Sequence, residues 1–331
     1  MKITDNQNNR SNSNDNKVIL NDKKNSSILR NEKDFEKEKS DIVAINRVTW
    51  KQKMASYSRH KSSFVLLLLV VFSAVVTIAV LGFLVGYILI NGIPNLSLDL
   101  FALEYTSNNS SMLPAIINTF IMTGIALLIS VPLGIFSAIY LTEYAKRGNK
   151  IVELVRITAE TLSGIPSIVY GLFGMLFFVT TLGYGYTVFS GALTLSIMVL
   201  PTIMRTTEEA LLSVPDSFRE GSFGLGAGRL RTVFRIVLPS AVPGILSGII
   251  LAVGRIVGET AALIYTAGTV AEIATDIFSS SGRTLAVHMY SLAREGLHMD
   301  AAYATAVVLL LIVMGINGVS SLVAKKIAKG N

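Results

Sequence analysis

Two charged residues, Arg255 and Glu259, lie four positions apart inside an apolar stretch of the sequence. A charge at the centre of a bilayer costs roughly 2.5–3.5 kcal/mol on insertion scales, so it normally faces a pathway or a paired group. The donor fork of an arginine fits a passing oxyanion. Glu259 would hold the guanidinium and reject or release the anion; alternatively, the two form a structural ion pair. Arg205, which follows Pro201, is a second path candidate or an inner-face anchor.

Small residues share one face of the predicted helix with this charged pair. At 100° per residue, the members of the face fall within about 80° of one another. Small side chains let helices approach closely in a bilayer, and the charges exclude lipid as the neighbour. The face is therefore predicted to point to the bundle interior, an aqueous path or a partner subunit. Its members are Gly244, Gly248, Ala252, Arg255, Glu259 and Ala262.

A polar segment between two apolar stretches has the spacing of a docking element. Glu220-Gly221-Ser222 is followed after three residues by Gly226, and after nine more by Ile236-Val237-Leu238-Pro239. This predicts a short helix, a bend that glycine permits, and a second helix that ends before the proline. The pattern resembles the cytoplasmic signature of ATP-binding-cassette (ABC) importer permeases, in which Glu-Ala-Ala is followed at these spacings by Gly and Ile-x-Leu-Pro. Here Glu-Gly-Ser replaces Glu-Ala-Ala, which lowers the local helix propensity.

The composition predicts a membrane-spanning protein. The 331 residues are 51% hydrophobic and 15% charged, with a mean hydropathy of +0.56, too apolar for an ordinary soluble domain. Backbone groups in lipid must be hydrogen-bonded internally, so long apolar runs indicate helices. Six runs come near the ~20 residues that a spanning helix needs, and the third and fourth are short. They are Phe64–Ile90, Ile116–Tyr140, Ile165–Leu182, Val188–Met204, Val242–Ala262 and Ala301–Val323.

Lys and Arg alternate between the segments that connect these runs. The sequence up to residue 61 holds 14 of them, whereas the loops at 91–112 and 183–187 hold none. They return at 141–164, at 205–241 and in the C-terminal tail, but the segment 266–300 has only Arg283 and Arg294. Cytoplasmic loops are enriched in Lys and Arg. The predicted fold is therefore an all-α polytopic membrane helix bundle with six transmembrane helices and both termini inside (N-in/C-in).

Three regions follow from these patterns: a tail at 1–61, the first span with its outer loop at 62–112, and a permease-like transmembrane domain at 113–331. The tail has 14 Lys/Arg against 8 Asp/Glu and ten Asn, which predicts a disordered cytoplasmic segment without a cleavable signal peptide. Its end either lies along membrane lipid or is a plain linker. Residues 62–331 balance 15 basic against 14 acidic residues, so their charge does not favour nucleic-acid binding.

The predicted outer segment 266–300 is expected to include a short helix on the outer surface. His288 and His298 are candidate metal ligands there, but two loop histidines ten residues apart are more often solvated. The chain has no cysteine, which excludes disulfides, thiol chemistry and Cys-based metal sites. No metal site is predicted.

Four further segments are similar to the phosphate-transport permeases of ABC importers, and the Arg-Thr-Thr-Glu-Glu-Ala run and the Gly-Glu-Thr-Ala ending look more like the PstA-type subunit than its PstC-type companion. The similarity covers most of residues 113–323. It implies a type I importer permease in a bacterial or archaeal cell membrane. Its partners would be a homologous second permease subunit, two ATP-hydrolysing subunits and an extracytoplasmic phosphate-binding protein. The segments are YLTEYAKR (140–147), AETLSGIPSIVYGLFG (159–174), LPTIMRTTEEALLSVPDSFRE (200–220) and GRIVGETAALIYTAG (254–268).

The sequence lacks the G-x-x-x-x-G-K-[ST] motif that cradles nucleotide phosphates, and no lysine occurs between residues 151 and 324. ATP and Mg are therefore expected on a partner chain, with no cofactor on this one. The predicted function is a transport subunit without enzymatic activity. Alternatives are a permease for another oxyanion, such as sulfate or molybdate, and a proton-driven secondary carrier. The docking pattern argues against the carrier, which has no ATPase to bind.

Overall fold

The computed structural model describes residues 61–146 and 148–329, and no β-strand occurs in these ranges. The chain divides into two units between Val80 and Leu81. Helix α3 (Lys61–Gly92) crosses this division and confirms the first predicted span. Its side chains Phe83 and Ile90 are 69% and 75% exposed, as a lipid-facing helix requires. The predicted tail lies, except for its last residue, outside the described ranges.

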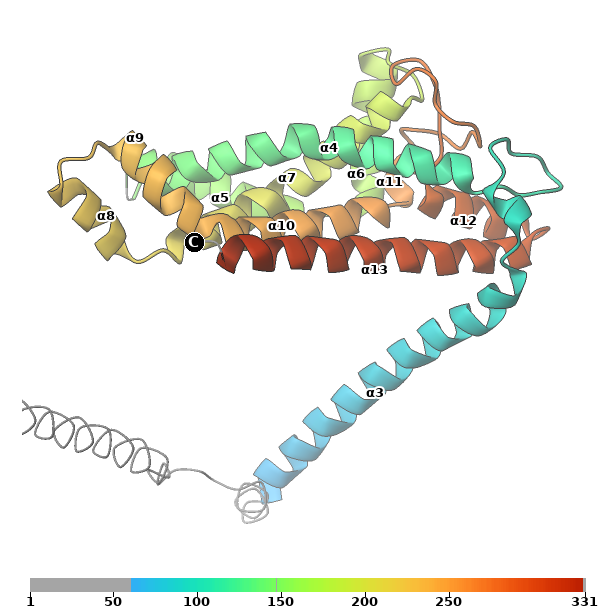
Figure 1. Cartoon of the computed structure of the whole chain (residues 1–331), viewed down its shortest axis with the longest axis horizontal. Helices are drawn as coiled ribbons and strands as arrows, with labels where there is room; N and C mark the ends of the chain where they lie inside the picture. Colours follow the sequence, from blue (N-terminus) through green and yellow to red (C-terminus); the bar gives the residue numbers. More distant parts are fainter. Residues whose placement is uncertain (1–60, 147, 330–331) are drawn as a thin grey trace, which may run out of the picture. The chain divides into compact units, whose positions relative to one another are not determined.

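Four further helices, all in the second unit, are long and apolar enough to cross a membrane. Neighbours in this set pack side by side: α4 against α7, α7 against α10, and α10 against α13 (Figure 1). They confirm the second, fourth, fifth and sixth predicted spans with shifted bounds. The helices are α4 (Leu113–Ile139, continued by a π-helical turn, Tyr140–Tyr144), α7 (Val188–Leu212), α10 (Leu238–Val257) and α13 (Met299–Lys329).

The predicted third span is not one straight helix. Helix α5 (Lys150–Ser163) is followed by α6 (Ser167–Gly174) and a π-helical turn (Met175–Thr181), with a bend of 103° between them. Pro166 lies in the break; its preceding residue is pushed away from helical geometry, so the chain restarts in a new direction. Among the described residues, five helices are candidate spans, and the predicted number of six is reached when the bent pair counts as one.

The helix that follows the docking segment does not end before Pro239. Helix α9 (Arg229–Thr232), a π-helical turn (Val233–Val237) and α10 form one helical stretch from Arg229 to Val257. The wide turn directly precedes the proline, whose ring would clash with a tight preceding turn and whose nitrogen cannot donate. The C-terminal end of the predicted fifth span also differs, because α10 ends at Val257 with Gly258 as its C-cap and does not continue to Ala262.

The two ends of the second unit differ in charge. Helices α8 (Asp216–Gly224) and α9, with their arginines, lie at the same end as the C-terminus of α13 (Figure 1). Helices α11 (Ala261–Ile264) and α12 (Leu285–Glu295) and the loop at 102–112 lie at the opposite end. This arrangement agrees with the orientation predicted from Lys and Arg. The short helix predicted in the outer segment is α12, which packs against α13 and α4.

The core of the second unit lies between α4, α7 and α10. Met122, Leu195 and Ile256 are no more than 2% exposed and belong to one cluster of buried apolar side chains. Gly248 brings α10 close to α7, because a Cβ at this position would overlap the side chain of Thr206. The small-residue face predicted for this helix is thus a helix–helix contact at its middle.

Replacing Gly248 with alanine is expected to lower the free energy of unfolding by about 1–3 kcal/mol, because the added methyl group overpacks the α7–α10 contact. The matched control is Gly254→Ala on the same helix, where the nearest atom to an added Cβ is Asn317 Oδ1 at 3.8 Å. Thermal unfolding of the purified protein in detergent measures both. Equal midpoints for the two variants would contradict this contact.

Candidate translocation path and docking groove

Arg255 lies in the last turn of α10 and is partly buried. The C-terminal end of a helix favours a cation, which helps to keep the guanidinium charged in apolar surroundings. The buried Tyr170 of α6 interacts with Arg255 electrostatically. Leu251, one turn earlier, is 61% exposed, whereas Ala252 and Ile256 are buried. Arg255 therefore lies where the packed core borders an open face of the second unit.

Glu259 is not on the same helix as Arg255, and the predicted ion pair is absent from the salt bridges of the described residues. Gly258 ends α10, so the helical periodicity used to align the two side chains stops one residue before Glu259. The carboxylate is buried, and its Oε1 accepts a hydrogen bond from the backbone N–H of Ala262 at 3.1 Å. Glu259 thus stabilises the start of α11.

Arg205 lies inside α7 and joins it to α5. Its Nε donates to Glu209 Oε1 at 3.1 Å and its Nη1 to Glu160 Oε1 at 3.3 Å, with the side chain 53% exposed. Next to it, Arg156 of α5 pairs with Glu208 of α7 at 2.5 Å. This geometry fits the anchor interpretation, and a direct role of Arg205 in the path stays a prediction.

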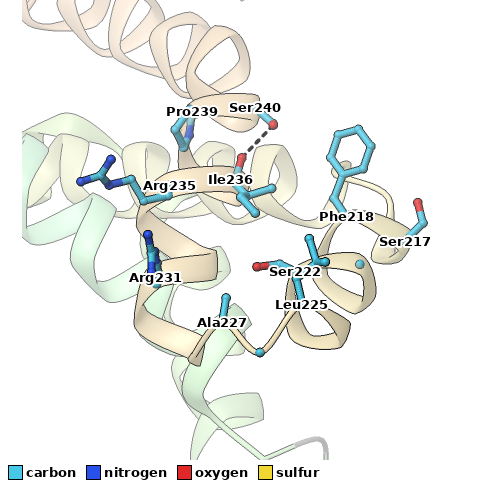
Figure 2. Close-up of a pocket in the computed structure, with 12 residues that line it drawn as sticks. Ser217, Phe218, Ser222, Leu225, Ala227, Arg231, Arg235, Ile236, Pro239 and Ser240 are labelled. Carbon is cyan, nitrogen blue, oxygen red and sulfur yellow. Dashed lines mark hydrogen bonds between the residues drawn. The ribbon is translucent and has the colours of Figure 1, made fainter.

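A groove of about 910 Å³ lies at the basic end of the second unit, between α8 and the helical stretch that begins at α9. Figure 2 shows Phe218 and Leu225 on the α8 side and Arg231 and Arg235 on the other side. The two sides are joined by a hydrogen bond of 2.8 Å between the hydroxyls of Ser222 and Thr232. Apolar and aromatic side chains beside exposed arginines make a surface on which a partner protein can dock.

Gly226 makes the turn between the two sides of the groove. Its φ is +82°, a left-handed conformation that side chains disfavour, so a glycine is required where the sequence pattern places one. Of the seven predicted coupling residues, Glu220 is exposed but outside the groove lining, and Leu238 packs against the core. The other five line the groove: Gly221, Ser222, Gly226, Ile236 and Pro239.

Arg219 is a connecting residue that the sequence did not single out. From α8 it donates to Glu143 Oε1 at 2.7 Å, to the carbonyl of Leu211 at 2.9 Å and to the carbonyl of Val214 at 2.7 Å. The Arg219 and Glu143 side chains are only 15% and 9% exposed. This contact ties the docking helix to the ends of α4 and α7. Glu143 and Arg219 are 76 residues apart, so no local spacing reveals the pair.

The histidines of the outer segment differ from the prediction. His288 is fully buried on α12, so the solvated interpretation is wrong for it, while His298 is partly exposed. Within the described ranges, no group of three or more His, Asp or Glu side chains could hold a metal ion. His288 instead lies close to the buried Arg283, which the sequence pattern placed on a loop without a role.

Apolar helices, a charge at the edge of the core and a docking groove at the basic end define a membrane-embedded transport component. The chain belongs to the family described as "Binding-protein-dependent transport system inner membrane component", whose model matches residues 130–329. Its members are membrane transport components, which agrees with the prediction of a transport subunit that is not itself an enzyme.

Known relatives match this chain at moderate sequence identity. The chain is 38% identical over 247 residues to the "Probable ABC transporter permease protein YqgI" of Bacillus subtilis, covering 69% of this chain and 82% of the relative. It is 36% identical over 205 residues to the "Phosphate transport system permease protein PstA 1" of Mycobacterium tuberculosis, covering 61% and 67%. The PstA protein of Haemophilus influenzae is 33% identical over 218 residues, covering 65% and 77%.

Solved structures support the fold. A chain of a bacterial alginate ABC transporter, solved with a periplasmic protein bound to an alginate pentasaccharide, superposes with a TM-score of 0.61 at 17% identity. The match covers 82% of this chain and 98% of that chain. A chain of the MetNI methionine ABC transporter, in an inward-facing conformation, gives a TM-score of 0.51 at 20% identity, covering 65% and 94%. The fold is therefore that of ABC importer permeases.

Proposed function

We propose that this chain is the membrane-spanning permease subunit of an ATP-driven importer of inorganic phosphate. It would form part of the translocation path with Arg255 and dock the ATPase through the groove between α8 and α9. The observation that carries the proposal is this groove, because it provides a partner surface in a chain whose sequence lacks a P-loop. Phosphate as the substrate is supported by the names of several relatives.

The partners follow from this role. ATP and Mg would be bound by a pair of ATP-hydrolysing subunits at the cytoplasmic face. The open face beside Arg255 and Leu251 would be covered by a homologous second permease subunit, so that the guanidinium lines the path between the two. An extracytoplasmic phosphate-binding protein would deliver the anion to the outer end. The whole assembly would lie in the cell membrane of a bacterium or archaeon, with lipid around it and no nucleic acid as a partner.

Two alternatives remain for the substrate and the energy source. A permease for sulfate or molybdate would use the same arginine chemistry, because all three anions present oxygens to a guanidinium. A secondary carrier would use Glu259 as a proton carrier. The hydrogen bond from Ala262 gives this carboxylate a local structural task, and the docking groove has no use in a carrier.

Uptake of labelled phosphate, sulfate and molybdate by cells with and without this chain tests the proposal. Phosphate uptake is expected to depend on the chain and to stop when ATP is depleted while the ion gradients are maintained. If only sulfate or molybdate uptake depends on the chain, that anion and not phosphate is the substrate. Uptake that continues without ATP would contradict the ATPase partner.

Replacing Gly226 with valine is expected to weaken binding of the ATPase subunit about tenfold, because a β-branched side chain in the left-handed region costs roughly 1–2 kcal/mol and shifts the turn. The matched control is Gly228→Val in the same loop, since Gly228 has a φ of −74° and open space around it. Pull-down of the ATPase with detergent-purified permease measures both. An equally tight complex for Gly226→Val would contradict the docking role.

A further inference from the structure

The outer end of the second unit has a negatively charged surface. In the outer segments 93–112, 182–187 and 265–300, six exposed carboxylates stand against one exposed arginine, Arg294, because Arg283 is buried. None of the six belongs to a salt bridge of the described residues. A surface of this kind repels a free phosphate anion and attracts a basic partner. The carboxylates belong to Asp99, Glu104, Glu272, Asp276, Glu295 and Asp300.

Two of these carboxylates line one hollow of about 260 Å³, here called the outer hollow. Asp99 comes from a 3₁₀ turn that follows α3 (Leu98–Phe101), and Asp300 comes from the first turn of α13. The other polar residues of the lining include Asn95 and His298, and no Lys or Arg belongs to it. Ordinary small-molecule pockets measure about 300–1,000 Å³. The outer hollow is therefore of a size that suits one long side chain of a partner.

The loop that forms one wall of the outer hollow is fixed by Asn109. Its Oδ1 accepts hydrogen bonds from the backbone N–H groups of Thr106 at 2.9 Å and Ser111 at 3.0 Å. Its Nδ2 donates to the backbone carbonyl of Glu104 at 2.9 Å. The opposite wall is the start of a long helix, α13. Walls that are already ordered lose little conformational entropy when a partner binds, so the hollow is prepared for a contact.

Strongly exposed leucines accompany the carboxylates of the outer hollow. Leu297 belongs to the lining and is 81% exposed, and Leu98, between the lining residues Ser97 and Asp99, is 90% exposed. The adjacent carboxylates exclude the hydrocarbon of the bilayer as their neighbour, because a charge costs several kcal/mol there. Exposed apolar side chains that are rimmed by polar residues mark a contact with another protein. The leucines therefore indicate a protein partner, and the carboxylates indicate that its contacting face is basic.

We propose that the outer hollow receives a lysine or arginine side chain of the extracytoplasmic phosphate-binding protein, which Asp99 and Asp300 bind while Leu98 and Leu297 make apolar contacts. The identity of this partner rests on the proposed function, whereas the basic character of its contacting face rests on the six carboxylates. The acidic surface then favours phosphate that arrives inside a basic protein over free phosphate. A metal ion fits less well, since no group of three or more His, Asp or Glu side chains in the described ranges could hold one.

Titration of phosphate uptake with the binding protein tests this contact. The complete complex is reconstituted in proteoliposomes with ATP inside, and the phosphate-loaded binding protein of the same organism is added outside. Asp99→Asn combined with Asp300→Asn is expected to raise the binding-protein concentration for half-maximal uptake about tenfold, as for a lost charge-assisted hydrogen bond. The deficit is expected to vanish at excess binding protein. Added salt should raise the half-maximal concentration more for the wild type than for this variant, because salt screens the attraction.

The matched control is Glu104→Gln combined with Glu272→Gln, which removes two exposed carboxylates of the same end that do not line the hollow. It is expected to raise the half-maximal concentration at most about twofold. Equal effects of the two double variants would overturn the hollow as the contact, and so would wild-type uptake that requires divalent cations outside the vesicles. Absence of phosphate uptake by the wild type would instead refute the proposed function, so the two failures are distinguished.

Discussion

Replacing Arg255 with alanine is expected to reduce phosphate uptake at least about thirtyfold, because truncating one partner of a desolvated charged contact costs about 2–5 kcal/mol. Arg255 is partly buried at the edge of the core and interacts electrostatically with Tyr170, and its face of the helix borders the open side of the second unit. The subunits are expected to assemble normally, since no salt bridge of the described residues involves this side chain. Labelled-phosphate uptake and the yield of purified complex measure the two effects.

Two further variants make this test specific. Arg255→Lys keeps the positive charge without the planar fork, so uptake is expected to lie between those of the wild type and the alanine variant. Arg294→Ala removes an exposed arginine of the outer segment and is expected to leave uptake unchanged. Normal uptake by the Arg255→Ala complex would exclude Arg255 from the path and leave it a structural residue.

Arg219→Ala is expected to uncouple ATP hydrolysis from transport. The change strands the carboxylate of Glu143, which is only 9% exposed, and removes the donors to the carbonyls of Leu211 and Val214. Breaking a buried pair from one side costs about 3–5 kcal/mol, so α8 should detach from the ends of α4 and α7. Phosphate transported per ATP hydrolysed, measured in proteoliposomes, is expected to fall at least about tenfold, with ATP hydrolysis continuing.

The contacts of Arg219 also predict how related variants behave. Asp216→Ala removes only an exposed partner, 69% of whose side chain is accessible, and should have little effect. Glu143→Gln keeps an acceptor for the Nη2 of Arg219 and should be milder than Glu143→Ala. The exchange Glu143→Arg with Arg219→Glu should not restore coupling, because a carboxylate at position 219 would face two carbonyl oxygens. Full coupling in that exchanged pair would show that the backbone contacts are dispensable.

The long apolar elements could be predicted from the sequence because their signal is local. Helices α3 and α13 contain the first and last apolar runs. Gly226, the glycine at which the sequence pattern predicted a bend, has the left-handed conformation that makes the docking turn. Internal hydrogen bonding forces such runs into helices whatever surrounds them. The gathering of the basic loops at one end of the helices could also be predicted, because Lys and Arg are enriched in cytoplasmic loops by a rule that ignores packing.

The arrangement around the charged residues could not be predicted in the same way. The alignment of Glu259 with Arg255 assumed that the helix continues, but Gly258 ends it and the carboxylate stabilises the next short helix. The bend before α6 depends on Pro166 and on packing against α7 and α11. His288 was expected in solvent because it was placed with His298 on a loop, yet the whole first turn of α12 is buried against other helices.

The uninterrupted helix from Arg229 to Val257 has a mechanical consequence. It carries side chains of the docking groove near one end and Arg255 near the other, and it is 29 residues long. A rod of this kind is roughly 40 Å long, so tilting it by about 5° about its lower end displaces the upper end by about 3–4 Å. That displacement exceeds the radius of a water molecule. Under the proposed function, a small swing of a docked ATPase would therefore shift the end of the helix that carries Arg255 by about 3–4 Å without any helix unfolding.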